Sequence, residues 1–193
     1  GKTWREYESP GSMFVDVVAY NNGDVATFDD PLQDKNWYGK VKSTNKGDMR
    51  LLDATSREWA YVTPDDHNSS NWSEATSAGE GSLVLMVSGD DRDGSAKGRV
   101  YLGDVSDSGQ VTYRDITPDD ELNADWASVA GNAAGDRLVA TQSNGRVFVA
   151  EKSVRTVTFM KRTVEVVSWN WQEVTSVAKH AHVNMSDDGQ TLV

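Results

Sequence analysis

The sequence predicts an all-β fold of the β-propeller class, built from four-stranded antiparallel blades, on three observations. The TPDD segment at residues 63–66 recurs at residues 117–120, an offset of 54 residues, and six residues after each copy comes a tryptophan, Trp72 or Trp126. Each repeat contains four short apolar or alternating stretches separated by Gly, Asn, Asp and Ser, a pattern typical of strands and turns. Four strands in this length match one propeller blade, which runs roughly 40 to 50 residues.

The repeats divide the chain into units of similar length. We expect residues 1–193 to form a single β-propeller segment with units at about 14–71, 72–125 and 126–179, a partial unit at 180–193, and residues 1–13 as an outer strand. About three and a half blades are therefore expected. Because propellers usually contain four to eight blades, the prediction is a partial ring closed by another chain, or a segment of a larger propeller.

The TPDD segments are expected to be corners between blades. Proline presets φ for a turn and aspartate accepts backbone hydrogen bonds there, while the neighbouring tryptophans fill the space between blades. The alternative is a ring of carboxylates that binds a ligand or metal, formed by Asp65, Asp66, Asp119 and Asp120. The runs at residues 83–87 and 138–140 do not alternate, so we expect strands covered on both faces.

Composition limits the classes of function. The chain carries 19 basic and 30 acidic residues, a net charge of −11, and this charge repels nucleic acid. No apolar run approaches the roughly 18 residues of a membrane helix, so no membrane span is expected. The absence of cysteine removes disulfides, thiolate metal sites and a cysteine nucleophile. No cofactor is predicted.

A ligand site is expected on the propeller face shared by two sets of loops, those between second and third strands and those between blades. A long loop at residues 29–48 places Trp37 and Tyr38 beside polar neighbours. Aromatic rings stack on apolar sugar faces while carboxylates accept from sugar hydroxyls. Trp37 and Tyr38 are thus candidates for glycan binding, and burial of both rings by loop packing is the alternative.

Two other motifs do not meet the requirements of a metal site. Residues 90–94 (DDRDG) place only two acids on the alternate positions that a calcium loop needs, and His180 and His182 lack a visible third ligand, so no metal site is predicted. Residues 153–168 alternate around Lys161 and Arg162, which indicates an additional hairpin. This insertion either contacts a partner or only extends its blade.

Several segments resemble the Asp-box (BNR, sialidase-like) propeller repeat, whose pattern is Ser-x-Asp-x-Gly-x-Thr-Trp. GKTW at residues 1–4 is similar to its second half, SDSGQVTY at 106–113 is a degenerate copy with Tyr113 in the tryptophan place, and residues 126–153 are similar to its companion pattern. Such repeats occur in secreted bacterial proteins, glycoside hydrolases, sortilin-type receptors and phage tail or fibre proteins. The resemblance therefore implies an extracellular or virion-surface location.

The functional expectation is a non-catalytic binding or structural module whose partners are glycans or proteins. The alternative is a sialidase-like glycoside hydrolase with catalytic residues partly outside this segment, because the Arg-Ile-Pro motif of that family is absent from these residues. A third interpretation is architectural, in which exposed blade edges assemble with neighbouring chains. No catalytic residue is assigned.

Overall fold

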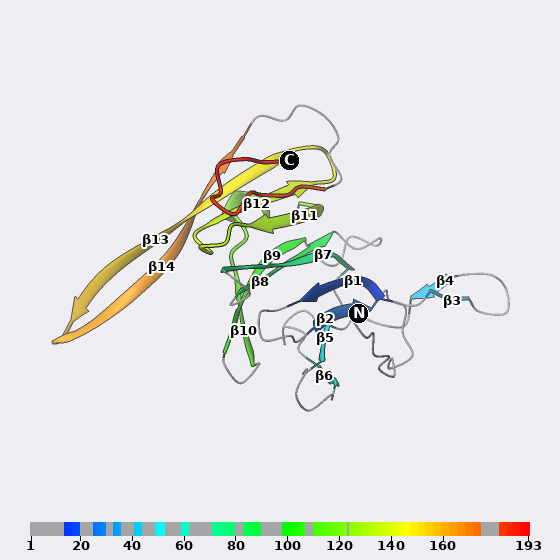
Figure 1. Ribbon diagram of the computed structural model, residues 1–193, viewed down its shortest axis with the longest axis horizontal. Coiled ribbons are helices and arrows are strands. Elements are labelled where there is room, and N and C mark those ends of the chain that lie inside the picture. Colours follow the sequence, from blue (N-terminus) through cyan, green and yellow to red (C-terminus); the bar gives the residue numbers. More distant parts are fainter. Residues whose placement is uncertain are drawn as a thin grey trace, which may run out of the picture.

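A computed structural model describes residues 14–19, 25–29, 33–35, 41–43, 49–52, 59–61, 71–79, 83–89, 98–106, 110–122, 124–174 and 182–193. Within these ranges, three four-stranded antiparallel sheets follow one another along the chain (Figure 1). In chain order, the first sheet consists of β1 (Phe14–Ala19), β2 (Val25–Asp29), β5 (Met49–Leu52) and β6 (Trp59–Tyr61). The second consists of β7 (Asn71–Ala78), β8 (Leu83–Gly89), β9 (Arg99–Val105) and β10 (Val111–Asp115). The third consists of β11 (Trp126–Gly131), β12 (Arg137–Gln142), β13 (Val147–Phe159) and β14 (Arg162–Glu173).

The sheets are arranged as propeller blades. Each is a meander in which successive strands of the sheet are hydrogen-bonded neighbours, and the first strands of successive sheets lie against one another, β7 against β1 and β11 against β7. This arrangement confirms the predicted fold class. The predicted loop at 29–48 differs in one respect, because it contains a two-stranded hairpin formed by β3 (Gln33–Lys35) and β4 (Val41–Ser43). No helix in the described ranges is long and apolar enough to cross a membrane.

Apolar residues between the second and third sheets form the main core. Trp126, at the start of β11, is fully buried and packs edge-on against Phe148 with 5.4 Å between ring centroids. The cluster draws residues from both sheets: Ala78, Leu83, Val100 and Leu102 from one, and Trp126, Val129, Leu138, Ala140, Phe148 and Ala150 from the other. For these two blades the structure confirms that an indole ring fills the space between them.

The central strand β12 explains the absence of alternation at residues 138–140. Leu138 and Ala140 face the cluster shared with the second sheet, whereas Val139 faces the opposite side, where it packs with Val183. All three of these β12 side chains are fully buried. A strand covered on both faces needs apolar residues on both, so its sequence reads as a continuous run.

The C-terminal segment, residues 182–193, covers the outer side of the third sheet. It turns back on itself through an antiparallel bridge between Met185 and Leu192. Val183 N donates to Ser128 Oγ at 3.0 Å, just as Val129 N in the preceding unit donates to Glu74 Oε2 at 3.1 Å. Because these contacts recur at the spacing of the repeat, the segment lies beside the third sheet as β11 lies beside the second.

Strands β13 and β14 extend far beyond the rest of their sheet. Their pairing continues from Phe148↔Glu173 to Phe159↔Arg162, whereas β12 pairs with β13 only as far as Glu151. The extension leaves the body as a two-stranded ribbon (Figure 1). Its turn residues, Met160 and Lys161, have φ of 47° and 66°, the signs that a two-residue type I′ turn requires. The predicted hairpin at 153–168 is thus confirmed as a prolongation of the blade, with its turn one residue earlier than expected.

Candidate functional site

The corner between the second and third sheets meets the β12–β13 turn at one end of the blades. The corner carries a 3₁₀ turn, η2 (Asp119–Glu121), and the two loops are joined by Gln142 Nε2, which donates to Glu121 Oε2 at 2.9 Å. Loops between blades and between second and third strands therefore share a face here, as the sequence predicts. The corner itself is stabilised by Thr117, whose backbone N donates to Asp115 Oδ1 at 2.9 Å.

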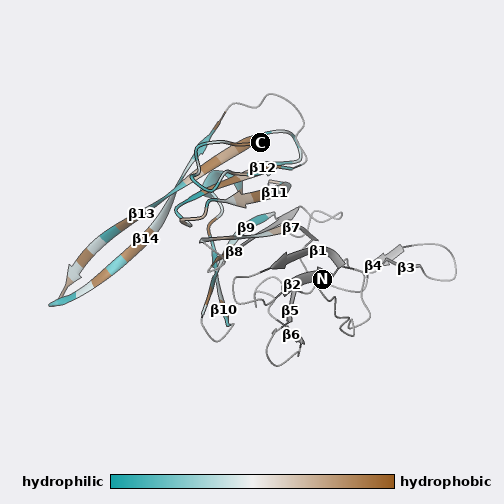
Figure 2. Cartoon of the chain, viewed as in Figure 1, coloured by the Kyte–Doolittle hydropathy of each residue, from teal (hydrophilic) through white to brown (hydrophobic). Residues whose placement is uncertain are grey.

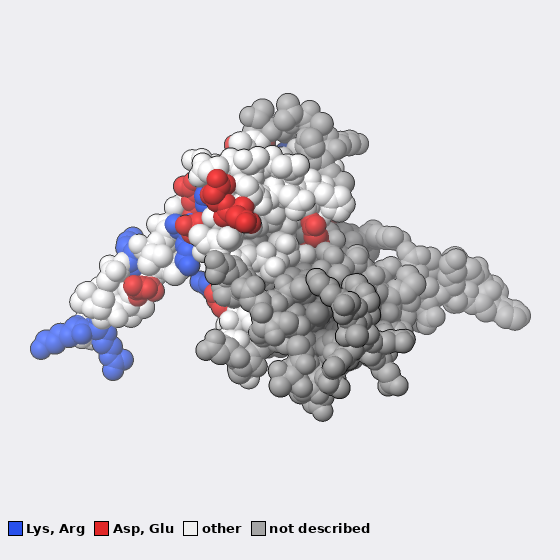
Figure 3. Space-filling view, in the orientation of Figure 1, with Lys and Arg blue, Asp and Glu red and all other residues white. Residues whose placement is uncertain are grey.

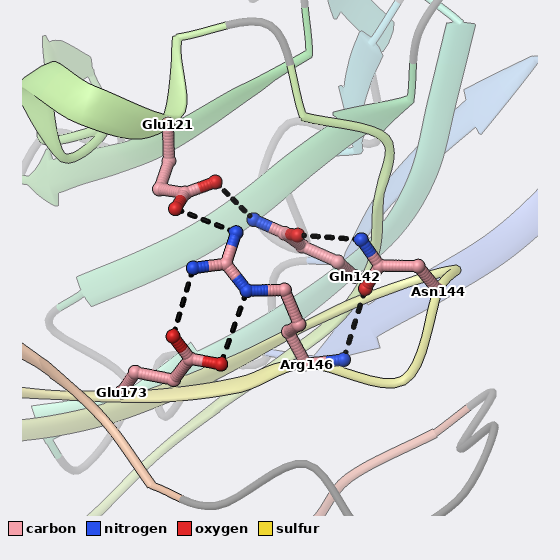
Figure 4. Close-up of polar contacts among 5 residues, drawn as sticks. All are labelled: Glu121, Gln142, Asn144, Arg146 and Glu173. Carbon is pink, nitrogen blue, oxygen red and sulfur yellow. Dashed lines mark hydrogen bonds and ion pairs between the residues drawn. The ribbon is translucent and has the colours of Figure 1, made fainter.

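Arg146, in the β12–β13 turn, connects this turn to the corner and to β14 (Figure 4). Its Nε and one terminal nitrogen donate to the two oxygens of Glu173 on β14, at 3.1 and 2.8 Å. Its other terminal nitrogen lies 2.6 Å from Glu121 Oε1 in the corner. The guanidinium also lies 4.8 Å from the ring centroid of Phe148, within the range of a cation–π contact. We call Glu121, Gln142, Asn144, Arg146 and Glu173 the Arg146 cluster.

Charge pairing dominates the electrostatics of the Arg146 cluster. The hydrogen bond from Arg146 lowers the pKa of Glu173 below its ordinary value of 4.5, and the same bond is the largest cause that raises the pKa of Arg146. Glu173 is therefore held ionised beside the guanidinium of Arg146. Because Arg146 is already paired with two acids, the cluster acts as a structural connection between the loops.

Replacing Arg146 with glutamine should destabilise the fold in a pH-dependent way. The folded-state pKa of Glu173 is depressed, so its stabilisation is present above about pH 4.5 and is lost as the pH falls through the folded value. The variant should therefore be less stable than the wild type at pH 7, and the difference should shrink as the pH falls below about 4.5. Urea unfolding across pH 3 to 8 measures this.

Arg114→Gln is the matched control for that experiment. Arg114 pairs with Asp104 at 2.7 Å, and these side chains are 40% and 50% exposed, whereas the side chain of Glu121 is only 12% exposed. An exposed ion pair contributes little, while a nearly buried carboxylate left without its partner is costly. Equal losses in the two variants would contradict a special role for Arg146.

Only two of the predicted ligand-binding residues lie in the described part of the chain. Asp119 and Asp120 are exposed on η2, next to Glu121 of the Arg146 cluster. Trp37, Tyr38, Asp65 and Asp66 lie outside the described residues, so their grouping into one site stays a prediction. Across the ranges that are described, no group of three or more His, Asp or Glu side chains could hold a metal ion.

Sequence reasoning missed the Arg146 cluster because its members are far apart in the chain. Arg146 and Glu173 are 27 residues apart, and the length of the ribbon decides that they meet. The available signal was the position of the two residues on either side of the predicted hairpin at 153–168. Opposite charges at that position can pair across neighbouring strands once the register is known.

The ribbon carries a second candidate surface. Cross-strand pairs place Val157 opposite Val164, Arg155 opposite Val166, and Phe159 opposite Arg162. Alternate residues of a strand share a face, so we define these six residues as the apolar face of the ribbon. The other face carries Thr156 opposite Glu165 and Thr158 opposite Thr163, with Val154 opposite Val167 at its base. Figure 2 shows hydrophobic and hydrophilic residues alternating along both strands.

The apolar face is uncovered in the described structure. Phe159 is 71% exposed, and Met160 in the turn is 82% exposed. Val157, Val164 and Val166 are also exposed, although each would be expected to be buried in an ordinary sheet. A two-stranded hairpin with no packing partner is marginally stable in water, so this surface is suited to being covered by another molecule.

Comparisons with known proteins support the fold. No protein-family model and no curated protein matches the chain. The chain is similar in structure to the Cps50 (Swd1) β-propeller domain of Myceliophteria thermophila, with a TM-score of 0.54 and 14% identity over 90% of this chain and 44% of that one. It is also similar to the WD40 repeats of RRP9, with a TM-score of 0.50 and 11% identity over 88% of this chain and 43% of that one.

These likenesses define the chain as a β-propeller segment of four-stranded blades. Their identities are low, so they show the fold alone. The chain spans less than half the length of either structure. Both neighbours are propellers, and the RRP9 domain is of the WD40 type. The Asp-box subtype stays a prediction.

Proposed function

We propose that the chain is a non-catalytic module that binds partner proteins and that the β13–β14 ribbon is a docking surface. The observation that carries the proposal is the uncovered apolar face of the ribbon, with Phe159 at its end. Exposed apolar patches with polar rims mark interaction sites in soluble proteins. The WD40-type neighbour supports the same class of function, because propellers commonly present loops and edges to other proteins.

A shortened variant tests this function. Ser153 and Ser168 are directly paired, so residues 154–167 can be replaced by Asn-Gly, which forms a two-residue hairpin turn. The intact and shortened chains are each panned against a display library of random 12-residue peptides. We expect peptides that bind the intact chain and lose at least about tenfold in affinity, or roughly 1.4 kcal/mol, on the shortened chain. Peptide binding that survives the shortening would contradict docking at the ribbon.

The shortened chain also needs a folding control. The ribbon residues are exposed and the core cluster lies between the sheets, so the unfolding midpoint in urea should change little. A large drop in the midpoint would show that the ribbon is structural, and it would contradict a surface available to partners.

Glycan binding at Trp37 and Tyr38 and a location outside the cell or on a virus particle remain proposals derived from the sequence. A glycan array combined with a hydrolysis assay on the same polysaccharides separates glycan binding from the glycoside hydrolase alternative. Glycan binding that is kept by the shortened chain and lost in Trp37→Ala would favour the glycan proposal over protein docking.

A further inference from the structure

The apolar face of the ribbon carries basic side chains and no acidic one. Arg155 and Arg162 lie on it, paired with Val166 and Phe159, whereas Glu165 lies on the opposite face, paired with Thr156. Residues 154–167 contain three basic side chains and one acidic side chain, a net charge of +2 in a chain whose total is −11. Figure 3 shows Lys and Arg side chains gathered at the tip of the ribbon.

The charge at the end of the ribbon is separated from the acidic body. Six residue steps from Ser153 to Phe159 span about 20 Å at roughly 3.3 Å per residue. Charges are screened over about 8 to 10 Å at physiological ionic strength. A partner approaching the end of the ribbon therefore meets a positive, apolar surface.

We infer that the apolar face of the ribbon binds an acidic, extended segment of a partner protein. This inference rests on the proposed function. Arg155 and Arg162 are four cross-strand pairs apart, about 13 Å along the ribbon, and the pair Val157 and Val164 lies midway between them on the same face. Residues i and i+4 of an extended peptide are separated by the same distance and share a face with residue i+2. A segment with Asp or Glu at i and i+4 and an apolar residue at i+2 would place its acids beside Arg155 and Arg162 and its apolar side chain against Val157 and Val164.

Two other occupants fit the face less well. A second copy packed face to face would bring Arg155 and Arg162 of both chains together without an acidic side chain between them, and like charges placed opposite one another are destabilising. A membrane surface would receive Met160 and Lys161 first, because they form the turn, so a cationic group would enter ahead of Phe159 and the valines.

The test uses the peptides that the intact chain selects from the 12-residue library. We expect the selected peptides to carry acidic residues four positions apart with an apolar residue midway. Arg155→Glu combined with Arg162→Glu should weaken their binding by about tenfold or more, because opposed like charges replace attraction. The same peptides with both acids changed to lysine should bind this double variant better than they bind the wild type. Glu165→Lys, on the opposite face, is the control and should change affinity by less than about threefold.

Each contrary result would lead to a different conclusion. Selected peptides that lack acids, or that bind the double variant as well as the wild type, would overturn the inference, and ribbon-dependent binding would still support the proposed function. Absence of any ribbon-dependent peptide would overturn both. Binding to vesicles of phosphatidylserine and phosphatidylcholine through Arg155 and Arg162, without peptide binding, would assign the face to a membrane. Dimerisation in sedimentation experiments that the double variant abolishes would assign it to a second copy.

Discussion

Trp126→Ala should lower the free energy of unfolding by about 3 to 5 kcal/mol, the range found for large buried aromatic side chains. Trp126 is fully buried and contacts Phe148 and Trp171 with ring centroids 5.4 and 6.2 Å apart. It also belongs to the cluster that joins the second sheet to the third, so the cavity would lie between two blades. Urea unfolding followed by circular dichroism measures the loss without depending on the indole that is removed.

Trp126→Phe separates packing from hydrogen bonding in the same position. In the described structure Trp126 Nε1 is buried without a hydrogen-bond partner, so phenylalanine removes volume but also removes an unpaired donor. The expected loss is only about 1 to 2 kcal/mol, because removing that donor offsets part of the lost packing. Phe159→Ala, at an exposed ring, should cost still less. A Trp126→Ala variant as stable as Phe159→Ala would refute a core between the blades.

Gly135→Ala should cost about 2 to 4 kcal/mol, combining backbone strain with overpacking. Gly135 has a φ of +67°, and a Cβ placed there would lie 2.7 Å from Leu83 Cδ1 and 3.0 Å from Gly79 Cα of the second sheet. The glycine thus lets the β11–β12 turn approach the preceding blade. The same urea titration measures the effect, and a loss below about 0.5 kcal/mol would contradict this close approach.

Two further variants divide that cost into its parts. Gly135→Asn should relieve some of the strain at positive φ but keep the steric conflict, because asparagine tolerates the left-handed region. In a double-mutant cycle with Leu83→Ala, part of the cost of Gly135→Ala should disappear, since the nearest atom belongs to that side chain. Additive effects would mean that the backbone of Gly79, rather than Leu83, sets the limit.

Gly189 repeats this arrangement one unit later. Its φ is +69°, and an added Cβ would meet Arg137 Cδ at 3.0 Å and Asn132 Nδ2 at 3.1 Å. Arg137 follows Leu83, and Gly189 follows Gly135, by 54 residues in both cases. The contact between successive units therefore recurs although the side chain that makes it changes from leucine to arginine.

Much of the architecture was predictable because strand formation and turn chemistry are local. The period-two patterns, the corner at residues 117–120 and the continuous apolar run at 138–140 each correspond to a described element. The burial of Trp126 was also predictable, because a large aromatic residue repeated at the start of each unit has few places to lie except between sheets. The structure tests less of the predicted ligand site, because four of its six residues lie outside the described ranges.

The sequence by itself determined the number of strands per unit, the repeat spacing and the burial of Trp126 between blades, because hydrophobic periodicity and turn residues act over a few positions. Only the tertiary structure decided which distant charges meet and which apolar residues remain uncovered. Arg146 reaches Glu173 because of the β13–β14 register, and Val157 and Val164 stay exposed because they lie on the part of β13 and β14 that extends beyond the rest of the sheet. Such contacts depend on strand length and register, which are set by the packing of the whole sheet.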